Sequence, residues 1–344
     1  MKRYIQSILF GALCLTFSTS HAQDFEKAGD YLSYIGQSQK ELGTKYLSYI
    51  SASSHGKNMR KIEKRRSALI ESINDTRTKI FNMPSFNGDK SLRDSAVTHL
   101  KLLYSVFNED YSKIVNMEEI AEQSYDNMEA YLLAKDKVSE KLGASSEAYD
   151  RTEKEFAAKN DINLLENQSE LSRKLKAAGE TNDYYNTVYL IFFKASVQES
   201  YLVEALSAKN TSSIEQNRST LIKYSSEGLE KLKSMKGYNS DKSLENACKK
   251  ALEFYIEEAE KKIPILSDFI ISSENFELVK KAYENGDKNK QAVDNYNKSV
   301  NELNKSVNTY NNVNRQLNDS RSSLVSNYNT TVESFLDTHM PHAN

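Results

Sequence analysis

Apolar residues recur along most of this chain at alternating intervals of three and four positions, with polar and charged residues between them. This spacing places one apolar seam along a helix, as in helical bundles and coiled coils. The first expected seam contains Ala28, Leu32, Ile35, Leu42, Tyr46 and Tyr49, and the second contains Met59, Ile62, Leu69, Ile73, Ile80 and Met83. No segment alternates convincingly between apolar and polar residues as a strand does. The pattern predicts an all-α protein of long helices.

Breaks in the apolar seam are expected after the first helix and again after the second, before a long third helix. A linker is expected at Ser51–Lys57, and Pro84 is expected to end the second helix. The third helix is expected to begin near Asp89 and to continue, with a bend near Asn108–Asp110, as far as Leu142.

A fourth, charged helix is expected to close this first unit. Gly143 predicts a break, and a helix is expected from about Ser146 to Ala178. Gly179 predicts its end, because glycine commonly follows the last residue of a helix.

One stretch of the chain occurs twice. Residues Ile62–Leu100 align without a gap on Ile214–Leu252, at a constant offset of 152 residues, and 14 of the 39 positions are identical. Such self-similarity indicates a duplication. The sequence therefore predicts two tandem, antiparallel helical bundles of about four helices each, over residues 24–178 and 179–338, in an elongated molecule.

The second unit has two features of its own. Pro264 predicts a kink just before it in the third helix, close to the position that matches the bend expected in the first unit. The last helix carries a heptad repeat, with Val293, Val300, Val307 and Asn314 in one series and Tyr296, Leu303, Tyr310, Leu317 and Leu324 in the other. We expect this seam to pack on its own bundle, with self-association between chains through residues 293–324 as the alternative.

The two ends of the chain are expected to lie outside the bundles. Residues 1–22 have the positive start, short apolar run and small residues before a cleavage point that are typical of a secretory signal peptide. Residues 339–344 are expected to form a flexible tail. The protein is therefore predicted to be exported, to the periplasm, the outer surface or the medium.

Composition narrows the classes of function. Removal of the signal peptide, which carries Lys2 and Arg3, changes the net charge from −2 to −4, with both signs interspersed along the chain. This charge argues against nucleic acid or an anionic membrane as an obligate partner. Cys248 is then the one remaining cysteine, so no intramolecular disulfide is possible, and it is expected to be a small core residue.

Arg66 and Arg218 occupy equivalent positions of the repeat, and each interrupts the apolar seam of the second helix of its unit. An unpaired buried charge is costly, so each arginine is expected to pair with a carboxylate or with carbonyls at a helix end. The alternative is an anion or small-ligand pocket in the bundle core at Arg66 or Arg218.

The second shared feature is a corner between the second and third helices. Phe86 and Asp89 in the first unit match Tyr238 and Asp241 in the second. The aspartate is expected to cap the helix that follows, and the aromatic ring to dock on adjacent helices. Because the alternating oxygen ligands of a calcium loop are missing, the pattern favours a structural corner over a cation site.

The sequence contains no HExxH, P-loop, GxSxG or Rossmann glycine pattern. We therefore predict a non-enzyme without a cofactor or a metal site, and we assign His339 and His342 to the tail. Tyrosines are abundant, and the pattern Tyr-Leu-Ser-Tyr-Ile occurs at Tyr31–Ile35 and again at Tyr46–Ile50. These tyrosines are expected at the margin of the core, with an exposed binding strip for a glycan or a protein as the alternative.

Residues Phe86–Leu142, with the stretches GDKSLRDS and NEDYSKIVNMEEIAEQSYD, resemble a family of uncharacterised exported bacterial proteins labelled as surface proteins. The resemblance implies a bacterial, envelope-associated, helical protein, and it brings no catalytic residues.

These observations predict a non-catalytic module of the cell envelope or surface that binds a protein, a glycan or a lipid. Two alternatives remain open. One is a membrane-active or pore-forming helical protein, for which Val188–Phe193 and Ile263–Ile271 are the most apolar runs. The other is a small-ligand carrier with a bundle-core pocket at Arg66 or Arg218.

Overall fold

The computed structural model describes residues 25–55, 58–110, 121–164 and 169–343, so the expected signal peptide lies outside the described residues. The protein is all-α, as predicted. Its helices are α1 (Ala28–His55), α2 (Met59–Phe81), α3 (Ser91–Ser105), α5 (Tyr125–Lys159), α6 (Glu170–Ser207), α7 (Thr211–Lys233), α8 (Ser243–Glu257), α9 (Ile263–Asn285) and α10 (Lys290–His339). Two π-helical segments, η1 (Val106–Asp110) and η2 (Glu258–Lys262), follow α3 and α8.

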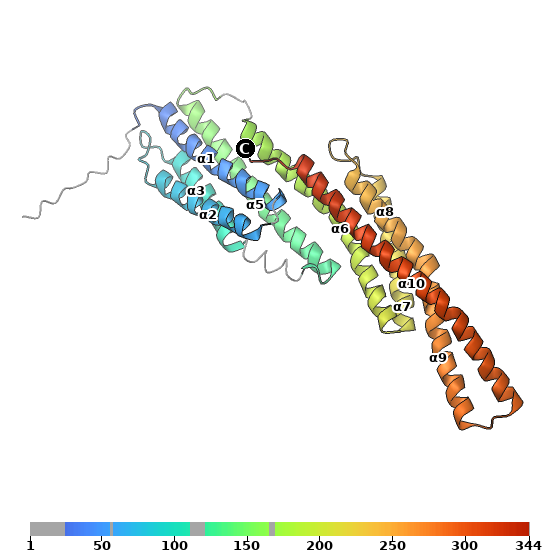
Figure 1. Cartoon of the computed structure of the whole chain (residues 1–344). Coiled ribbons are helices and arrows are strands. Elements are labelled where there is room, and N and C mark those ends of the chain that lie inside the picture. Colours follow the sequence, from blue (N-terminus) through green and yellow to red (C-terminus); the bar gives the residue numbers. More distant parts are fainter. Residues whose placement is uncertain (1–24, 56–57, 111–120, 165–168, 344) are drawn as a thin grey trace, which may run out of the picture.

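The molecule is elongated, with its helices lying roughly along one axis (Figure 1). Helices α1, α2, α3 and α5 pack together in one half, and α6, α7, α8 and the second part of α10 pack together in the other. The hairpin of α9 and α10 extends beyond the body as a two-helix arm (Figure 1). Helix α10 then runs back along the second half, so that its C-terminal end contacts α1.

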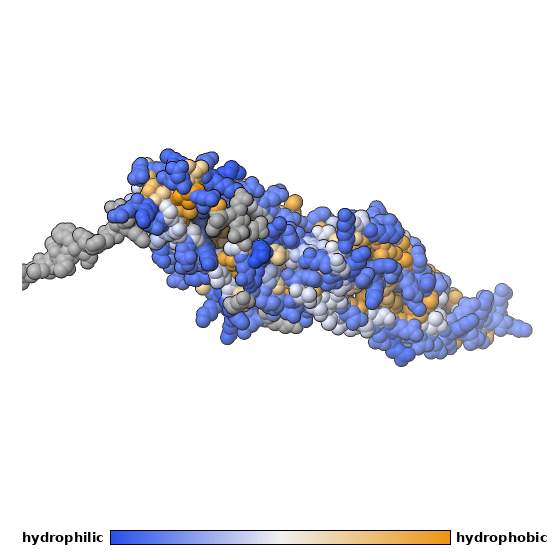
Figure 2. Space-filling view, turned by 90° about the horizontal axis from the view of Figure 1, so that it is seen from above, coloured by the Kyte–Doolittle hydropathy of each residue, from blue (hydrophilic) through white to orange (hydrophobic). Residues whose placement is uncertain are grey.

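Each half of the molecule has its own hydrophobic core. The first core includes Tyr31, Ile35, Leu69, Ile73 and Leu100, and the second includes Val188, Leu221, Leu252, Ile263, Leu266 and Ile270. The face drawn in Figure 2 is hydrophilic at the tip of the arm, with apolar residues visible in the body of each half. Both apolar runs that suggested a membrane-active hairpin, Val188–Phe193 and Ile263–Ile271, contribute to the second core. Within the described residues, no helix combines the length and apolar character that crossing a membrane requires.

The sequence repeat coincides with a repeat of local structure. Helices α2 and α7, α3 and α8, and η1 and η2 all begin and end at positions 152 residues apart. The residues before α2 and α7 also match, because Asn58 and Asn210 each accept a hydrogen bond from the backbone N–H three residues further on. Asparagine is a favourable N-cap for this reason. The structural agreement, from Asn58 to Asp110 in the first unit, extends beyond the aligned residues Ile62–Leu100 at both ends, and common ancestry stays a prediction.

Several predicted helix boundaries are wrong. Residues Ser51–His55, expected in a linker, continue α1. The expected break at Gly143 and the expected end at Gly179 do not occur, since Gly143 lies inside α5 and Gly179 inside α6. One glycine costs a helix only about 1 kcal/mol, which burial of neighbouring side chains readily outweighs. The boundary expected between residues 178 and 179 therefore falls within one continuous helix.

The true break lies in the stretch that was expected to form the charged helix from Ser146 to Ala178. Helix α5 ends at Lys159, where Asn160 donates from its side chain to the carbonyl of Phe156, and Asp161 adopts a positive φ of 55°. Helix α6 begins after Ser169, whose hydroxyl accepts from the backbone N–H of Ser172. Helix α5 thus ends at a local asparagine and aspartate turn instead of a glycine.

Both irregularities predicted in the third helices fall at π-helical segments, but the first of these helices does not continue to Leu142, because α5 begins anew after the extended Ser124. The bend expected near Asn108–Asp110 coincides with η1, and the kink expected before Pro264 coincides with η2. Pro264 lies in the first turn of α9, directly after η2.

The last helix packs on its own chain, as expected. Val313, Leu317, Tyr328 and Phe335 are buried against the second half. The flexible tail predicted over residues 339–344 is wrong over the described part. His339 ends α10, and Met340 is only 1% exposed. Apolar burial of that methionine fixes the end of the chain.

Candidate functional site

The seam arginine of the first half joins α2 to η1. Arg66 donates from Nε and Nη2 to the two carboxylate oxygens of Glu63, at 2.9 and 2.7 Å, and from Nη1 to the carbonyl oxygen of Phe107 at 2.8 Å. The hydrogen bond from Arg66 lowers the pKa of Glu63. A π-helical turn departs from the regular helical hydrogen-bond pattern, and the arginine provides a donor to one of its carbonyls.

Arg218 makes the equivalent contacts in the second half. It donates to Glu215 at 2.9 and 2.5 Å and to the carbonyl oxygen of Ala259, in η2, at 3.4 Å. The pairing predicted for both arginines is confirmed, and each glutamate lies on the arginine's own helix, three residues earlier, so the ion pair does not join two helices. Because both guanidinium groups are held by a carboxylate and a carbonyl, the geometry does not support a ligand pocket at Arg66 or Arg218.

The two corners share one backbone conformation. Phe86 and Asp89 exchange backbone hydrogen bonds of 2.9 and 2.8 Å, as do Tyr238 and Asp241. In each corner the aspartate Oδ1 accepts from the backbone N–H two residues later, at 2.8 Å in the first and 2.7 Å in the second. The N-cap residues are Lys90 and Lys242, so each aspartate, which was predicted to be the N-cap, binds the helix start from one position before it.

The aromatic residues of the corners dock on adjacent helices, as predicted. The Phe86 ring lies 5.7 Å from that of Tyr31, and the Tyr238 ring lies 5.5 Å from that of Tyr184. These centroid distances fall in the range of favourable aromatic pairs.

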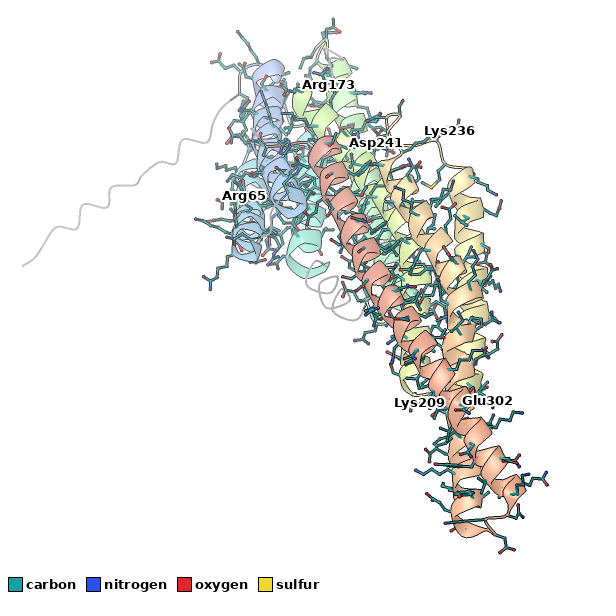
Figure 3. All side chains as sticks on the ribbon, turned by 45° about the vertical axis from the view of Figure 1, so that its right-hand side comes forward. Arg65, Arg173, Lys209, Lys236, Asp241 and Glu302 are labelled. Carbon is teal, nitrogen blue, oxygen red and sulfur yellow. The ribbon has the colours of Figure 1, made fainter. Side chains whose placement is uncertain are left out.

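The aspartates of the corners bind side chains from the ends of other helices. Asp89 Oδ2 lies 2.7 Å from Lys159 Nζ, and this contact lowers the pKa of Asp89 to about 2. Asp241 Oδ2 lies 2.8 Å from His339 Nε2, at the end of the second half where α10 ends (Figure 3). Each corner therefore holds the end of a distant helix, and the prediction of a structural role is confirmed.

A cavity of about 560 Å³ lies between the two halves, where α1, η1, α5 and α6 meet near the end of α10. Its aromatic lining residues are Tyr46, Tyr49, Phe107, Tyr131 and Tyr185. Its polar and charged lining residues are Ser53, Ser54, Lys135, Asp136, Ser139, Asn182, Asp183 and Asn186. A few polar groups set among aromatic rings are typical of sites that bind small ligands or short stretches of a polymer.

The aromatic wall is held in place by the first core. The rings of Tyr46 and Tyr49 contact the Phe107 ring edge-on, with centroids 5.5 and 6.1 Å apart. Phe107 is in turn fixed through its carbonyl by Arg66. Burial raises the pKa values of Tyr46 and Tyr185, so both hydroxyls stay protonated and can donate hydrogen bonds.

The opposite wall of the cavity is acidic. Burial raises the pKa of Asp183, and the neighbouring carboxylates of Asp136 and Glu180 raise it further. Lys135 lies beside them, with its ammonium 5.3 Å from the centre of the Tyr131 ring. The wall therefore offers carboxylate acceptors in a setting that disfavours additional negative charge.

The cavity continues as a groove along α6. A hollow of about 400 Å³ shares Asp136, Ser139, Asp183 and Asn186 with the cavity. A third hollow, of about 350 Å³, shares Thr187 and Leu190 with the second and includes Tyr125, Lys194 and Tyr224. We call the three connected hollows the α6 groove. Their succession along one helix suits an extended ligand better than a compact one.

Sequence patterns anticipated only one wall of this site. The repeated Tyr-Leu-Ser-Tyr-Ile pattern pointed to Tyr46 and Tyr49, and the core margin predicted for them is confirmed, since Tyr49 is only 9% exposed. The lining residues of α5 and α6 were missed, because the cavity forms where these helices meet α1 and no pattern along the chain predicts that contact. Cys248 is a fully buried core residue, as predicted, and burial raises its pKa to about 12.

No family model, no curated protein and no solved structure matches the chain. The resemblance of residues Phe86–Leu142 to exported surface proteins of bacteria therefore stays a prediction.

Proposed function

We propose that this protein is a non-catalytic, exported helical module that binds a neutral glycan of the cell envelope in the α6 groove. The observation that carries the proposal is the tyrosine-lined cavity of about 560 Å³ between the two halves. Ligand sites typically have volumes of roughly 300–1,000 Å³. The cavity is large enough for a short oligosaccharide segment, and the connected hollows extend it.

The lining chemistry favours a neutral sugar over the other ligand classes. Tyrosine rings such as Tyr131 and Tyr185 offer flat apolar faces for the C–H face of a sugar ring. Carboxylate and amide oxygens of Asp136, Asp183 and Asn186 can accept hydrogen bonds from sugar hydroxyls. The same carboxylates repel a phosphate or an anionic lipid headgroup.

Export and the envelope setting rest on the sequence. The pattern of residues 1–22 supports secretion, and the resemblance of residues Phe86–Leu142 supports an envelope location. The non-catalytic assignment rests on the absence of HExxH, P-loop, GxSxG and Rossmann glycine patterns from the sequence.

The test is calorimetric titration of residues 23–344 with oligosaccharides released from the envelope polysaccharide of the producing cell. Tyr131→Ala and Asp183→Ala should each weaken binding at least ~5-fold, the factor that corresponds to a loss of about 1 kcal/mol. Tyr283→Ala is the matched control, because Tyr283 stacks on Tyr296 in the arm, away from the groove.

Three results would contradict the proposal. They are equal weakening in Tyr283→Ala, no binding of any envelope oligosaccharide, and hydrolysis of the bound sugar, which would make the protein an enzyme. Titration with a library of basic peptides is a separate experiment, since the acidic wall can also attract positive charge. Binding of such a peptide without binding of any oligosaccharide would assign a protein ligand instead.

A further inference from the structure

The fold brings three potential metal ligands together from distant parts of the chain. His55 ends α1, Asp337 lies in the last turns of α10, and His342 follows that helix. One ligand atom from each residue lies within 4.8 Å of the other two. The sequence separates His55 from the other two residues by more than 280 positions, so no spacing motif could reveal the cluster.

The ring nitrogens of His55 are shielded but poorly paired. Its side chain is 14% exposed, and within the described residues neither shielded nitrogen has a hydrogen-bond partner. Its Nδ1 lies 3.3 Å from Asp337 Oδ1. Shielded polar nitrogens without partners are rare in folded proteins, and a bound ion can satisfy them.

The distances fit a small transition-metal ion. Zinc binds histidine nitrogen and carboxylate oxygen at about 2.0–2.2 Å in tetrahedral geometry, which places neighbouring ligand atoms about 3.3 Å apart. The separation between His55 Nδ1 and Asp337 Oδ1 already has this value. We propose that His55, Asp337 and His342 bind a divalent transition-metal ion of the Zn²⁺ class.

His342 must turn to complete the set. Its ring stacks on that of His55, with centroids 3.9 Å apart and planes inclined by 15°, so the two rings cannot both point at one ion as they lie. His342 is exposed and lies beyond the helix, which leaves its side chain free to rotate. Burial of Met340 keeps the backbone of this segment beside α1 during that rotation.

The donor types define which ions fit. Two imidazoles and one carboxylate suit zinc and its neighbours in the first transition series, whereas magnesium and calcium prefer sites built from oxygen alone. Three protein ligands also leave one coordination position open for water or another molecule. Ser54 and Leu336, the chain neighbours of His55 and Asp337, line the cavity, so the cluster lies beside it. A bound ion would fasten the end of the chain to α1.

The test is calorimetric titration of the mature chain, purified without a polyhistidine tag, with ZnCl₂ and separately with MgCl₂. We expect one Zn²⁺ per chain and no binding of Mg²⁺. Asp337→Asn and His342→Ala should each weaken Zn²⁺ binding at least ~10-fold, since changes to groups that merely support metal ligands already cost 10–100-fold. His342 is exposed, so its variant tests the site without threatening the fold.

His339→Gln and Asp319→Asn are the matched controls. His339 is the neighbouring histidine, but it is held by Asp241, and Asp319 is an exposed aspartate on the same helix as Asp337. Both variants should bind Zn²⁺ as the unchanged chain does. The proposal is overturned if the unchanged chain binds no Zn²⁺, if His342→Ala binds it equally well, or if His339→Gln removes it. None of these results depends on glycan binding, because no sugar is present in the experiment.

Discussion

At the scale of single residues, the arginines on the apolar seams show how a charged side chain can be accommodated at the edge of a hydrophobic core. Arg66 is 17% exposed at its side chain and joins a carboxylate of α2 to a carbonyl of η1. Arg66→Met keeps the aliphatic stem but removes the hydrogen bond to that carbonyl. We expect the free energy of unfolding to fall by about 1–3 kcal/mol, the usual contribution of a hydrogen bond from a charged donor. Urea denaturation measures it, and Lys64→Met, an exposed position two residues earlier, should change it little.

A second residue-scale feature is a buried pair of carboxylates that share one arginine. Arg321 contacts Glu199 at 2.7 Å and also binds Glu258, whose side chain is fully buried. Burial raises the pKa of Glu258 to about 7, against the lowering effect of Arg321 and with a further rise from Glu199. In the folded state Glu258 therefore holds its proton to a higher pH than in the unfolded chain.

The pH dependence of stability follows from that raised pKa. Between the ordinary pKa of 4.5 and about 7 the folded state binds more protons than the unfolded state, so stability falls as the pH rises through this window. Glu258→Gln should flatten this dependence, measured by urea denaturation from pH 4.5 to 8. Glu257→Gln, at an exposed neighbour, should retain it. A slope that survives in Glu258→Gln would assign the effect to other groups.

The sequence carries a signal for this cluster in the heptad pattern of the last helix. The series Val293, Val300, Val307 and Asn314 continues at the same interval to Arg321, Tyr328 and Phe335. Tyr328 and Phe335 are each 2% exposed, so the seam extends to the end of α10. An arginine on an apolar seam predicted a paired side chain at Arg66 and Arg218, and the position of Arg321 on this seam predicts the same. Its partners Glu199 and Glu258 come from other helices, and no periodicity along the chain identifies them.

At the scale of elements, three helical glycines with different surroundings test why the expected breaks failed. A Cβ added at Gly143 or Gly179 would meet no atom within 4 Å. Gly143→Ala and Gly179→Ala should therefore raise the free energy of unfolding by about 0.5–1 kcal/mol each, because alanine loses less backbone entropy in a helix. Differential scanning calorimetry measures the change. If either variant is destabilised, the helix does not run through that glycine.

Gly228 is the contrasting case. A Cβ there would lie 2.8 Å from Cδ1 of Leu252 and 3.0 Å from Cγ2 of Ile191, where α7 packs against α8 and α6. Leu252 is fully buried, so its side chain has little room to move. Gly228→Ala should lower the free energy of unfolding, since overpacking typically costs about 1–3 kcal/mol and exceeds the helix gain. A more stable Gly228→Ala variant would show that this contact adapts without strain.

At the scale of the whole molecule, the two halves share local structure but differ in what surrounds it. Arg66 fixes the carbonyl of Phe107, whose ring lines the cavity, whereas Arg218 fixes that of Ala259, a buried residue of the second core. The repeated segments could be located from the sequence because seams, caps and turns are local patterns. The cavity could not, because it arises where α1 and α5 meet a continuous α6. The segments repeated in the two halves are therefore parts of the scaffold, and the proposed binding surface lies where the two halves differ.

The arm formed by α9 and α10 should be separable from this body. No residue from 271 to 312 is buried, and Glu302 lies near the level where the arm leaves the bundle (Figure 3). Replacing residues 273–306 by a short Asn-Gly turn keeps the contact between the Phe269 and Tyr310 rings, at 4.3 Å, and every buried residue of α10. The thermal midpoint should then shift by less than about 4 °C, which corresponds to roughly 1 kcal/mol in a domain of similar size.

Light scattering on the intact and shortened chains tests the predicted self-association through residues 293–324 in the same experiment. The heptad residues of the arm, such as Val300 and Leu303, are half-buried against α9, which leaves only part of the seam for a second chain. If the seam serves only this hairpin, both proteins are monomers. If the intact chain is a dimer and the shortened one a monomer, the arm carries the contact between chains. Unfolding of the shortened chain would instead show that the arm contributes to the core, contrary to the exposure of its residues.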